Sequence, residues 1–377
     1  MEKEIIVIGD IEMGAGNLTD DFISDQALSE LIHSLKARPH PVDLVLNGDT
    51  FDFLKCPSQL TPHTLYPRHI TKHISLAKLK LIYKAHTPVF QALKEFVAEP
   101  GKTVYFTLGN HDPDIVYPEV QQEIQQLLGN SERVIFSGLH YQSHDVHVEH
   151  GHQYDFLSAV NFDKLFLKHK GESILNLSFV TFGLISAFMN YKEQYPFMER
   201  IFPRPELLTH HRVIARKMNR HTIGYFLKSL VYYPFRFYSD PTYSFPSGLF
   251  RELYKRLRTL HWDVDNIASH VLRKRKLKNK IIVLGHIHEK RIVRGKNRIV
   301  IHPGSWRDEY DFQRKTRELI PRSKRYVQIL VENGKSVHHI IDLPLKRSIF
   351  YFDDVVKDEV SHIKRAAQEE NFPLFWA

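Results

Sequence analysis

Residues 280–288, Lys-Ile-Ile-Val-Leu-Gly-His-Ile-His, join an apolar run to two histidines. The four apolar residues from Ile281 to Leu284 are typical of a buried β-strand, and Gly285 is expected to turn the chain at its carboxyl end. Open α/β sheets place their ligands and catalytic groups at the carboxyl ends of strands. The stretch therefore predicts that His286 and His288 lie at the mouth of a sheet. A chain with 24 histidines can contain such a pair by chance, so the rest of the sequence has to support it.

Four other strand-like runs also end in side chains that can bind metal ions or transfer protons. They begin at Ile5, Leu44, Val104 and His147. The polar residues after them are Asp10 and Glu12, then Asp49, then Asn110, His111 and Asp112, and finally His150 and His152. Because the carboxyl ends of parallel strands share one edge of a sheet, we expect these groups to converge.

Helical patterns separate these strands. They cover residues 22–35, 73–97 with a possible break near Pro88, and 119–128, and residues 141–149 are expected to form one strand. The order β-α-β-α-β-α-β-β is typical of a layered α/β fold with helices on the faces of a sheet. Further strands are expected near 298–302, 326–331 and 337–343, with a short helix near 355–367.

Composition restricts the class of protein. With 377 residues, 42% of them apolar, the chain can bury a large core in one or two domains. Its only cysteine, Cys56, excludes an internal disulfide and a thiolate metal cluster. Residues 1–4 lead directly into a strand without a signal-peptide pattern, and no run reaches the roughly 18 apolar residues that span a bilayer. The nearest run, Ile174 to Met189, contains several polar residues and reads as a buried or interfacial helix. These features predict a cytoplasmic protein.

Residues 157–280 differ from the rest of the chain. They contain 22 Lys or Arg against 9 Asp or Glu, whereas the formal net charge of the whole chain is +9. They also hold 21 of the 45 aromatic residues. Basic residues recur every three or four positions at Arg212, Arg216 and Arg220, and again at Arg251, Lys255 and Arg258, as on helix faces. We interpret 157–280 as a mostly helical cap inserted into a catalytic domain formed by 1–156 and 281–345, with 346–377 as a tail.

The candidate ligands are all oxygen or nitrogen donors. They are Asp10, Glu12, Asp49, Asn110, His150, His286 and His288. Such donors suit manganese, iron, zinc or magnesium, and not copper(I) or iron–sulfur clusters. Seven donors exceed the four that one zinc ion usually takes, so two ions that share a carboxylate are expected. Two ions can clamp the attacking and leaving oxygens of a phosphoryl displacement, which points to phosphoester hydrolysis.

The motifs and their order resemble those of the calcineurin-like metallophosphoesterases. The matching blocks are Asp10-Ile11-Glu12, Gly48-Asp49, Gly109-Asn110-His111-Asp112, His150-Gly151 and Gly285-His286-Ile287-His288. The resemblance implies a β-sandwich flanked by helices and a hydrolase of phosphoric ester or diphosphate bonds. It also implies that Asp49 bridges two metal ions, with Asp10, Glu12 and His288 at one and Asn110, His150 and His286 at the other. His111 would then protonate the leaving oxygen, and Asp112 would orient its imidazole.

Glu12 departs from this family pattern, which usually has histidine there. A carboxylate is a harder donor, so it favours manganese or magnesium and leaves zinc and iron open; alternatively, Glu12 points away from the metal. Residues 303–307, Pro-Gly-Ser-Trp-Arg, resemble a loop of the branch that cleaves UDP-diacylglucosamine. Arg307 could bind a substrate phosphate or pair with Asp308 or Glu309. His152 could contact the substrate or act behind the metal ligands.

The basic and aromatic cap allows three interpretations. It could hold a lipid or rest on an anionic membrane, bind nucleic acid, or be an ordinary packed subdomain. We expect two-metal hydrolysis of a phosphodiester or pyrophosphate bond, in a lipid-linked or nucleotide diphosphate substrate. The alternatives are a nucleic-acid or nucleotide phosphodiesterase and a non-catalytic scaffold on the same fold.

Overall fold

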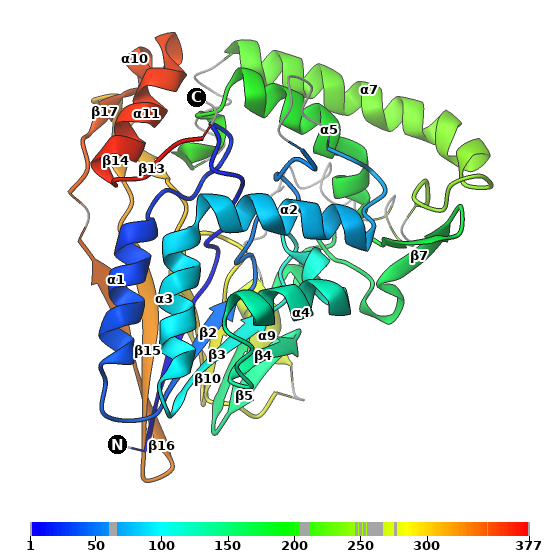
Figure 1. The fold of residues 1–377 in the computed structure, drawn as a ribbon. Coiled ribbons are helices and arrows are strands. Elements are labelled where there is room, and N and C mark those ends of the chain that lie inside the picture. The colour runs from blue at the N-terminus through cyan, green and yellow to red at the C-terminus, as the bar shows by residue number, and fades with distance from the viewer. Residues whose placement is uncertain are drawn as a thin grey trace.

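The computed structural model describes residues 2–375 except 60–65, 204–211, 246–247, 249–250, 252–253, 255–266, 275–276 and 345. Two sheets pack face to face in it, with helices on the outside (Figure 1). This arrangement confirms the predicted α/β class and the sandwich of sheets flanked by helices.

The first sheet has six strands in the order β16-β15-β1-β2-β3-β4. Its parallel part consists of β1 (Lys3–Ile8), β2 (Val42–Asn47), β3 (Lys102–Thr107) and β4 (Val134–Gly138). The hairpin β15 (Lys324–Glu332) and β16 (Lys335–Leu343) adds to β1 in antiparallel orientation. Because β1, β2 and β3 are parallel, their carboxyl ends all open at the same edge.

The second sheet has five strands in the order β11-β12-β10-β6-β5. Its centre is β10 (Ile281–Leu284), which is parallel to β6 (Val146–Glu149) and β12 (Ile299–Pro303). The outer strands, β5 (His140–Ser143) and β11 (Lys290–Arg294), are antiparallel. Ile5 and Val7 of β1 pack against Val148 and Val283 of this sheet, which forms the core of the sandwich.

Helices cover the outer faces of both sheets. The first sheet carries α1 (Asp25–Lys36), α2 (Lys72–Ala85), α3 (Thr87–Ala98) and α4 (Pro118–Leu127). The short helix α9 (Ile267–Arg273) packs on the second sheet. Side chains of β1 alternate accordingly, because Ile6 and Ile8 face the helices whereas Ile5 and Val7 face the other sheet.

The helices α5 (Phe179–Gln194) and α7 (Arg212–Arg236) of the insert, residues 157–280, lie across the end of the sandwich where the parallel strands finish (Figure 1). The insert also forms the hairpin β7 (Phe166–His169) and β8 (Glu172–Leu175), and the strand β9 (Ile201–Phe202). No helix in the described ranges combines the length and apolar character needed to cross a membrane.

A third sheet links this insert to the C-terminal segment. It has the order β17-β14-β13-β9, in which β9 of the insert runs parallel to β13 (Tyr310–Phe312). Its other strands are β14 (Glu318–Pro321) and β17 (Phe350–Tyr351), followed by α10 (Phe352–Lys357) and α11 (Glu359–Glu369). Residues 346–369 therefore pack as part of the fold, although the sequence suggested a polar tail.

Several local predictions differ from the structure. The single strand expected at 141–149 is a hairpin, because His144 turns the chain with φ 52°. Residues 174–175 end β8, so the expected helix begins only at Phe179. Of the second predicted basic helix, Lys255 and Arg258 lie outside the described residues.

Candidate active site

The candidate ligands follow strands of both sheets. Asp10, Asp49 and Asn110 come after β1, β2 and β3, whereas His150 and His286 come after β6 and β10. Since the two sheets are stacked with these strand ends at the same edge, one short loop from each brings a polar group to a shared centre. All seven predicted ligands lie in these strand-end loops, as the sequence suggested.

The backbone of these loops adopts an unfavourable conformation. Asp10, Glu12, Asp49, His286 and His288 all have positive φ, between 47° and 73°. A non-glycine residue in this region costs about 1–3 kcal/mol and persists only where the surroundings enforce it, typically at functional sites. The clustering of five such residues in one place therefore supports a functional role for the loops.

Two motif glycines allow the loops to approach one another. A Cβ atom on Gly109 would lie 2.0 Å from Oδ1 of Asp49, and one on Gly285 would lie 2.7 Å from Oδ2 of Asp10. Both distances are far below van der Waals contact. Any side chain at Gly109 would therefore displace the carboxylate that the sequence places at the centre of the site.

One group of donor atoms surrounds His150. Its Nε2 atom lies 3.1 Å from Oδ2 of Asp49 and 3.2 Å from Oδ1 of Asn110. The ring of His286 meets that of His150 edge to face at 5.4 Å between centroids. Nε2 of His286 lies 3.5 Å from Asp155, whose carboxylate can hold the imidazole in position.

A second group surrounds His288. Its Nε2 atom lies 3.4 Å from Oδ1 of Asp10 and 3.4 Å from Oε1 of Glu12, and its Nδ1 atom lies 2.9 Å from Glu309. Glu12 thus points toward the other donors, contrary to the alternative that it turns away. The backbone N–H of His286 donates to Asp10 at 3.0 Å, which fixes that carboxylate between the two groups.

These distances fit divalent metal ions. An ion bound at about 2.0–2.2 Å holds neighbouring ligand atoms about 3.0–3.5 Å apart, as the donor pairs around His150 and His288 are. Asp10, Asp49 and His150 are all buried, and such a concentration of carboxylates and imidazoles away from water calls for a compensating cation. A bound divalent ion supplies Lewis acidity and lowers the pKa of a bound water.

His152 lies beside these groups instead of facing the solvent. It is fully buried, with ring centroids 5.3 Å from His150 and 6.5 Å from His286. Neither ring nitrogen has a hydrogen-bond partner among the described residues. Burial holds the pKa of His152 well below its usual range, so the imidazole is neutral and its nitrogens can bind a metal ion. This position favours a role at the metal site over the predicted direct contact with substrate.

His111 reaches the site from the loop after β3, but its partner is not the predicted one. Its Nδ1 atom lies 3.0 Å from Oδ1 of Asp52. Asp112, expected to orient His111, instead accepts the backbone N–H groups of Thr50 at 2.8 Å and Gly109 at 2.7 Å. Asp112 therefore joins the loops after β2 and β3, and Asp52 orients the imidazole.

The charges around His111 favour its protonated form. Burial alone would lower the pKa of His111, but the carboxylates of Glu12, Asp52 and Asp49 raise it to about 9. The backbone N–H of His111 also donates to Oδ1 of Asp49 at 2.7 Å. The imidazolium is thus placed to donate a proton or stabilise negative charge next to the central carboxylate.

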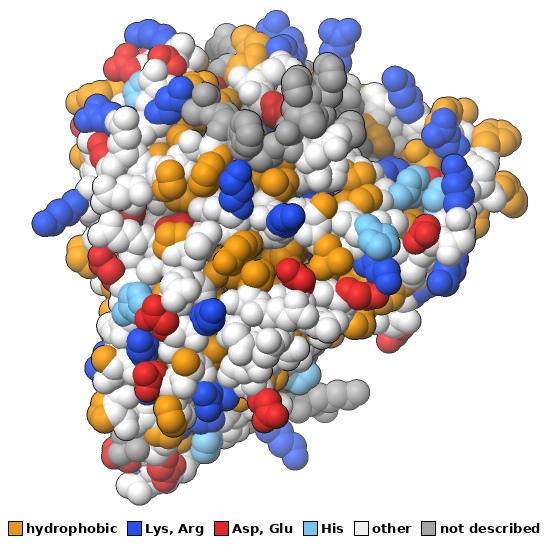
Figure 2. All heavy atoms as spheres, in the orientation of Figure 1, with side chains coloured by type: hydrophobic (Ala, Val, Ile, Leu, Met, Phe, Trp, Pro, Cys, Tyr) orange, Lys and Arg blue, Asp and Glu red, His pale blue; other side chains and the backbone are white. Residues whose placement is uncertain are grey.

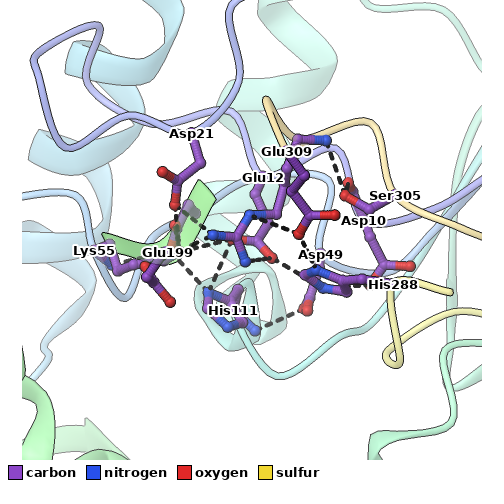
Figure 3. Close-up of polar contacts among 12 residues, drawn as sticks. Asp10, Glu12, Asp21, Asp49, Lys55, His111, Glu199, His288, Ser305 and Glu309 are labelled. Carbon is purple, nitrogen blue, oxygen red and sulfur yellow. Dashed lines mark hydrogen bonds and ion pairs between the residues drawn. The ribbon is translucent and has the colours of Figure 1, made fainter. Parts of the chain in front are cut away.

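Glu12 also belongs to a buried network of charges (Figure 3). Its Oε2 atom lies 2.8 Å from Nζ of Lys55, and its Oε1 atom lies 3.3 Å from Nη1 of Arg307. Both cations also contact Asp21, at 3.1 Å from Lys55 and 2.7 Å from Arg307. Burial would raise the pKa of Glu12, but Arg307 and Lys55 hold it well below the usual range, so the carboxylate is ionised.

Arg307 is consequently not available to the substrate. It is 1% exposed, and it contacts Glu12 and Asp21 with Glu309 at 3.8 Å. Binding of a substrate phosphate does not fit this position. The alternative, pairing with a neighbouring acid, holds for Glu309 but not for Asp308, which pairs with Arg200 and Arg347.

The insert contributes to the same network. Lys192 of α5 pairs with Asp21 and, at 2.6 Å, with Glu199, and Glu199 lies 3.2 Å from Lys55. Sequence reasoning missed Asp21, Lys55 and Glu199, because none of them belongs to a motif and only the fold brings them to Glu12. The insert is therefore tied to the loops of the site by buried ion pairs, which fix its position closely.

A cavity of about 220 Å³ opens beside His111. Its lining includes His111, Asn110 and Lys55 from the catalytic part, together with residues of the insert. The insert residues are Leu157, Ser158, Ser178, Val180, Thr181, Phe188 and Glu199. The cavity thus combines polar groups beside His111 with apolar side chains from the insert.

The family model for calcineurin-like phosphoesterases matches residues 3–298. The chain belongs to this family. It is a metal-dependent phosphoester hydrolase, and the strand-end loops described above contain groups of carboxylates and imidazoles that could hold divalent metal ions. This family assignment confirms the resemblance that the five motifs indicated.

Comparisons with solved structures return low similarities. Vacuolar protein sorting 29 from Cryptosporidium parvum is 11% identical with a TM-score of 0.28, over 90% of this chain and 97% of that one. A putative 5'-nucleotidase from Staphylococcus aureus is 12% identical with a TM-score of 0.33, over 97% and 58%. Phosphopantetheinyl hydrolase from Mycobacterium tuberculosis is 10% identical with a TM-score of 0.29, over 81% and 90%. No curated protein sequence matches the chain. The family model alone therefore carries the assignment.

Proposed function

We propose that this phosphoesterase uses two divalent metal ions to hydrolyse a phosphodiester or pyrophosphate bond in a lipid-linked or nucleotide diphosphate substrate. The observation that carries the two-ion proposal is the pair of donor groups around His150 and His288, with Asp10 between them at 4.0 Å from His150 and 3.4 Å from His288. Manganese is the expected metal, with magnesium, iron and zinc as alternatives, because Glu12 adds a hard oxygen donor.

His111 is the expected general acid. It lies at the edge of the cavity and is held by Asp52, and its raised pKa keeps a proton on the ring at neutral pH. A protonated imidazole can neutralise the charge that develops on the leaving oxygen. Asn110 lines the same cavity next to the expected metal ligands, so the anionic part of the substrate would lie beside the bound ions.

Hydrolysis of bis-p-nitrophenyl phosphate by metal-stripped protein tests this proposal. Manganese, magnesium or zinc is restored in turn, and the Asp49→Asn variant is the control because it weakens the ligand that is expected to bridge both ions. Turnover that requires metal and falls at least a hundredfold in the variant supports a two-metal phosphodiesterase. Stoichiometric metal binding without turnover on any substrate class would instead favour the non-catalytic scaffold. In that case His111→Ala should change neither metal content nor activity.

The outer surface of α7 favours a lipid-linked substrate over nucleic acid. Ile223, Leu227, Val231 and Phe235, spaced four residues apart, are 61–78% exposed, and Tyr238 beyond the helix is 90% exposed. Solvent-exposed apolar stripes of this length are unusual on a soluble surface. Packing among the described residues leaves this stripe exposed, whereas the apolar region of a membrane would cover it.

The charges of α7 suit an anionic membrane. Its sequence contains six Lys or Arg and no Asp or Glu. Arg216, Lys217, Arg220, Lys228 and Arg236 are exposed. Figure 2 shows basic and apolar side chains together along the margin where the end of α7 lies in Figure 1. Apolar side chains with basic neighbours bind interfaces rich in anionic lipid. We infer peripheral attachment to the cytoplasmic side of a membrane through α7.

Vesicle sedimentation tests this attachment. The protein is mixed with phosphatidylcholine vesicles that contain or lack phosphatidylglycerol. We expect binding to the anionic vesicles, and a loss of at least tenfold in Leu227→Glu, while Val337→Glu, an exposed apolar position on β16, leaves binding unchanged. The membrane proposal would be overturned if the native protein did not bind vesicles but formed a concentration-dependent dimer that Leu227→Glu abolished. That result would assign the stripe to a second copy of the chain.

Nucleic acid remains the second candidate partner because the same basic residues could follow a phosphate backbone. Two results would favour that alternative. Single-stranded DNA would compete with vesicles for binding to α7, and the enzyme would cleave oligonucleotides faster than bis-p-nitrophenyl phosphate.

A further inference from the structure

A cluster of metal-binding side chains lies outside the active site. It consists of His69 in the segment before α2, His169 at the end of β7, and Asp240 after the end of α7. Nε2 of His69 lies 2.7 Å from Oδ2 of Asp240, and Nδ1 of His169 lies 4.0 Å from its Oδ1. One donor atom from each residue lies within 4.8 Å of the other two.

The surroundings hold the carboxylate in place but leave the cluster accessible. Oδ1 of Asp240 accepts the backbone N–H of Thr242 at 3.0 Å and its hydroxyl at 2.8 Å. The two imidazole rings are stacked, with 4.3 Å between centroids and 10° between planes. The side chain of His69 is 36% exposed and those of His169 and Asp240 are 11% exposed, so an ion and a water molecule can enter.

We propose that His69, His169 and Asp240 bind a divalent transition-metal ion, zinc being the expected one, at a site distinct from the catalytic centre. Two imidazoles and a carboxylate are typical zinc donors, and a water completes four-coordination. Two donors on a tetrahedral zinc ion lie about 3.4 Å apart, so a small rotation of the rings closes the present spacing. The fixed orientation of Asp240 provides the kind of support that metal ligands need.

Such an ion would join the insert to the catalytic part. The neighbouring Arg68 already connects them, because Nε and Nη2 donate to the hydroxyl and carbonyl of Thr242 at 2.6 and 2.8 Å. Arg68 also donates to the carbonyl of Phe182 in α5, the helix whose Val180 and Thr181 line the active-site cavity. The ion would therefore hold the start of α5 and the segment after α7 against the segment before α2. This would restrict the motion of the α5 residues that line the cavity.

Zinc binding by tag-free protein tests the proposal without reference to activity. The Asp49→Asn/His150→Ala double variant weakens binding at the catalytic centre by removing two of its ligands, and zinc affinity is measured by competition with a chromogenic chelator. We expect this variant to keep one zinc equivalent. In that background, His169→Ala and the volume-conserving Asp240→Asn should each weaken binding at least tenfold, while His144→Ala, an exposed histidine in the β5–β6 turn, should not.

Cobalt provides a spectroscopic readout of the same site. Cobalt(II) bound by two imidazoles and a carboxylate in tetrahedral geometry should give visible absorption bands that His169→Ala removes. The proposal would be overturned if the background variant bound no zinc. It would also be overturned if the His169→Ala, Asp240→Asn and His144→Ala proteins had equal affinity for zinc. Because every arm measures zinc binding in the same background variant and none measures turnover, failure here leaves the proposed hydrolysis untouched.

Discussion

Nδ1 of His111 lies 3.0 Å from Oδ1 of Asp52, so the carboxylate that orients the expected general acid comes from the loop after β2. The adjacent residue Asp112 points the other way and accepts two backbone N–H groups. The two carboxylates therefore perform separable tasks, which leads to different expectations for their amide variants.

Asp52→Asn should lower kcat while leaving the metal sites filled. The amide cannot hold the imidazolium as a carboxylate does, and loss of a partner that orients a catalytic or metal-bound group typically costs about 10–100-fold. The measurements are kcat on bis-p-nitrophenyl phosphate and metal content by mass spectrometry. Because Lys55 also lies 2.9 Å from Asp52, the melting temperature is measured alongside. An unchanged kcat would show that Asp52 does not support His111.

Asp112→Asn should act on stability and metal content instead. Burial, with a contribution from Asp49, raises the pKa of Asp112 to about 7, and the two backbone N–H donors require an acceptor at both oxygens. An amide nitrogen facing one of them leaves a buried donor unpaired, at a cost of about 1–3 kcal/mol. We expect a lower melting temperature and weaker metal binding. A variant that keeps both but loses kcat would return Asp112 to the role first predicted for it.

Glu12 and Lys55 should show strong energetic coupling. Removing one partner of an isolated buried ion pair costs about 3–5 kcal/mol. Here the cost is smaller, because Lys55 keeps Asp21, Asp52 and Glu199 as partners and Glu12 keeps Arg307. Glu12→Gln and Lys55→Met should each lower the free energy of unfolding, and the double variant should lose less than their sum. Urea denaturation of the four proteins measures this. Glu12→His, the residue usual in the family, should also be destabilised, because an imidazole does not neutralise Lys55 and Arg307. Additive losses would show that the pair acts independently.

The strands and ligand loops could be predicted from sequence because both are local features. Apolar runs mark β1, β2, β3 and β10, and each is followed directly by its ligands, so chain order alone indicated the centre. Residues such as Asp10 and His286 needed no knowledge of the tertiary fold. The sequence did not predict residues whose role depends on contacts with distant parts of the chain.

Contacts across the fold explain the errors. Asp52 displaced Asp112 as the partner of His111 because sequence adjacency does not say where a side chain points. The sequence leaves Arg307 open between a substrate phosphate and a neighbouring acid because two of its counter-ions, Glu12 and Asp21, are nearly 300 positions away in the chain. The short strands β9, β13 and β17 were missed since each contains two or three residues, and pairing with one another stabilises them more than any local pattern.

The stability contributed by His86 should decline at alkaline pH. Its ring lies between Asp25, at 2.7 Å from Nδ1, and Asp20, at 3.0 Å from Nε2. Burial alone would lower the pKa of His86, but Asp25 and Asp20 raise it to about 10. The folded state therefore holds the proton more tightly than the unfolded chain, whose histidine pKa is about 6.5. The contribution is complete below about pH 6.5 and is lost as the pH rises toward 10.

Urea denaturation across this range tests the sign. The difference in unfolding free energy between the native protein and His86→Gln should be largest near pH 6 and should shrink by pH 10. The exposed His33→Gln provides the matched control and should show little dependence on pH. A difference that grows with pH would contradict the assignment. The loop concerned follows Glu12, since Asp20 also accepts the backbone N–H of Gly14 and Gly16.

Filling the cavity should change which diesters the enzyme accepts. Val180 of the insert lines the same cavity as His111, so Val180→Phe occupies space under the insert without replacing a predicted ligand. We expect kcat/KM for bis-p-nitrophenyl phosphate to fall at least tenfold relative to that for methyl p-nitrophenyl phosphate, a discrimination of about 1.4 kcal/mol. Metal content should stay unchanged, and Val337→Phe on β16 should affect neither substrate. An equal loss on both diesters would mean that the second substituent does not bind in this cavity, because steric exclusion there must depend on its size.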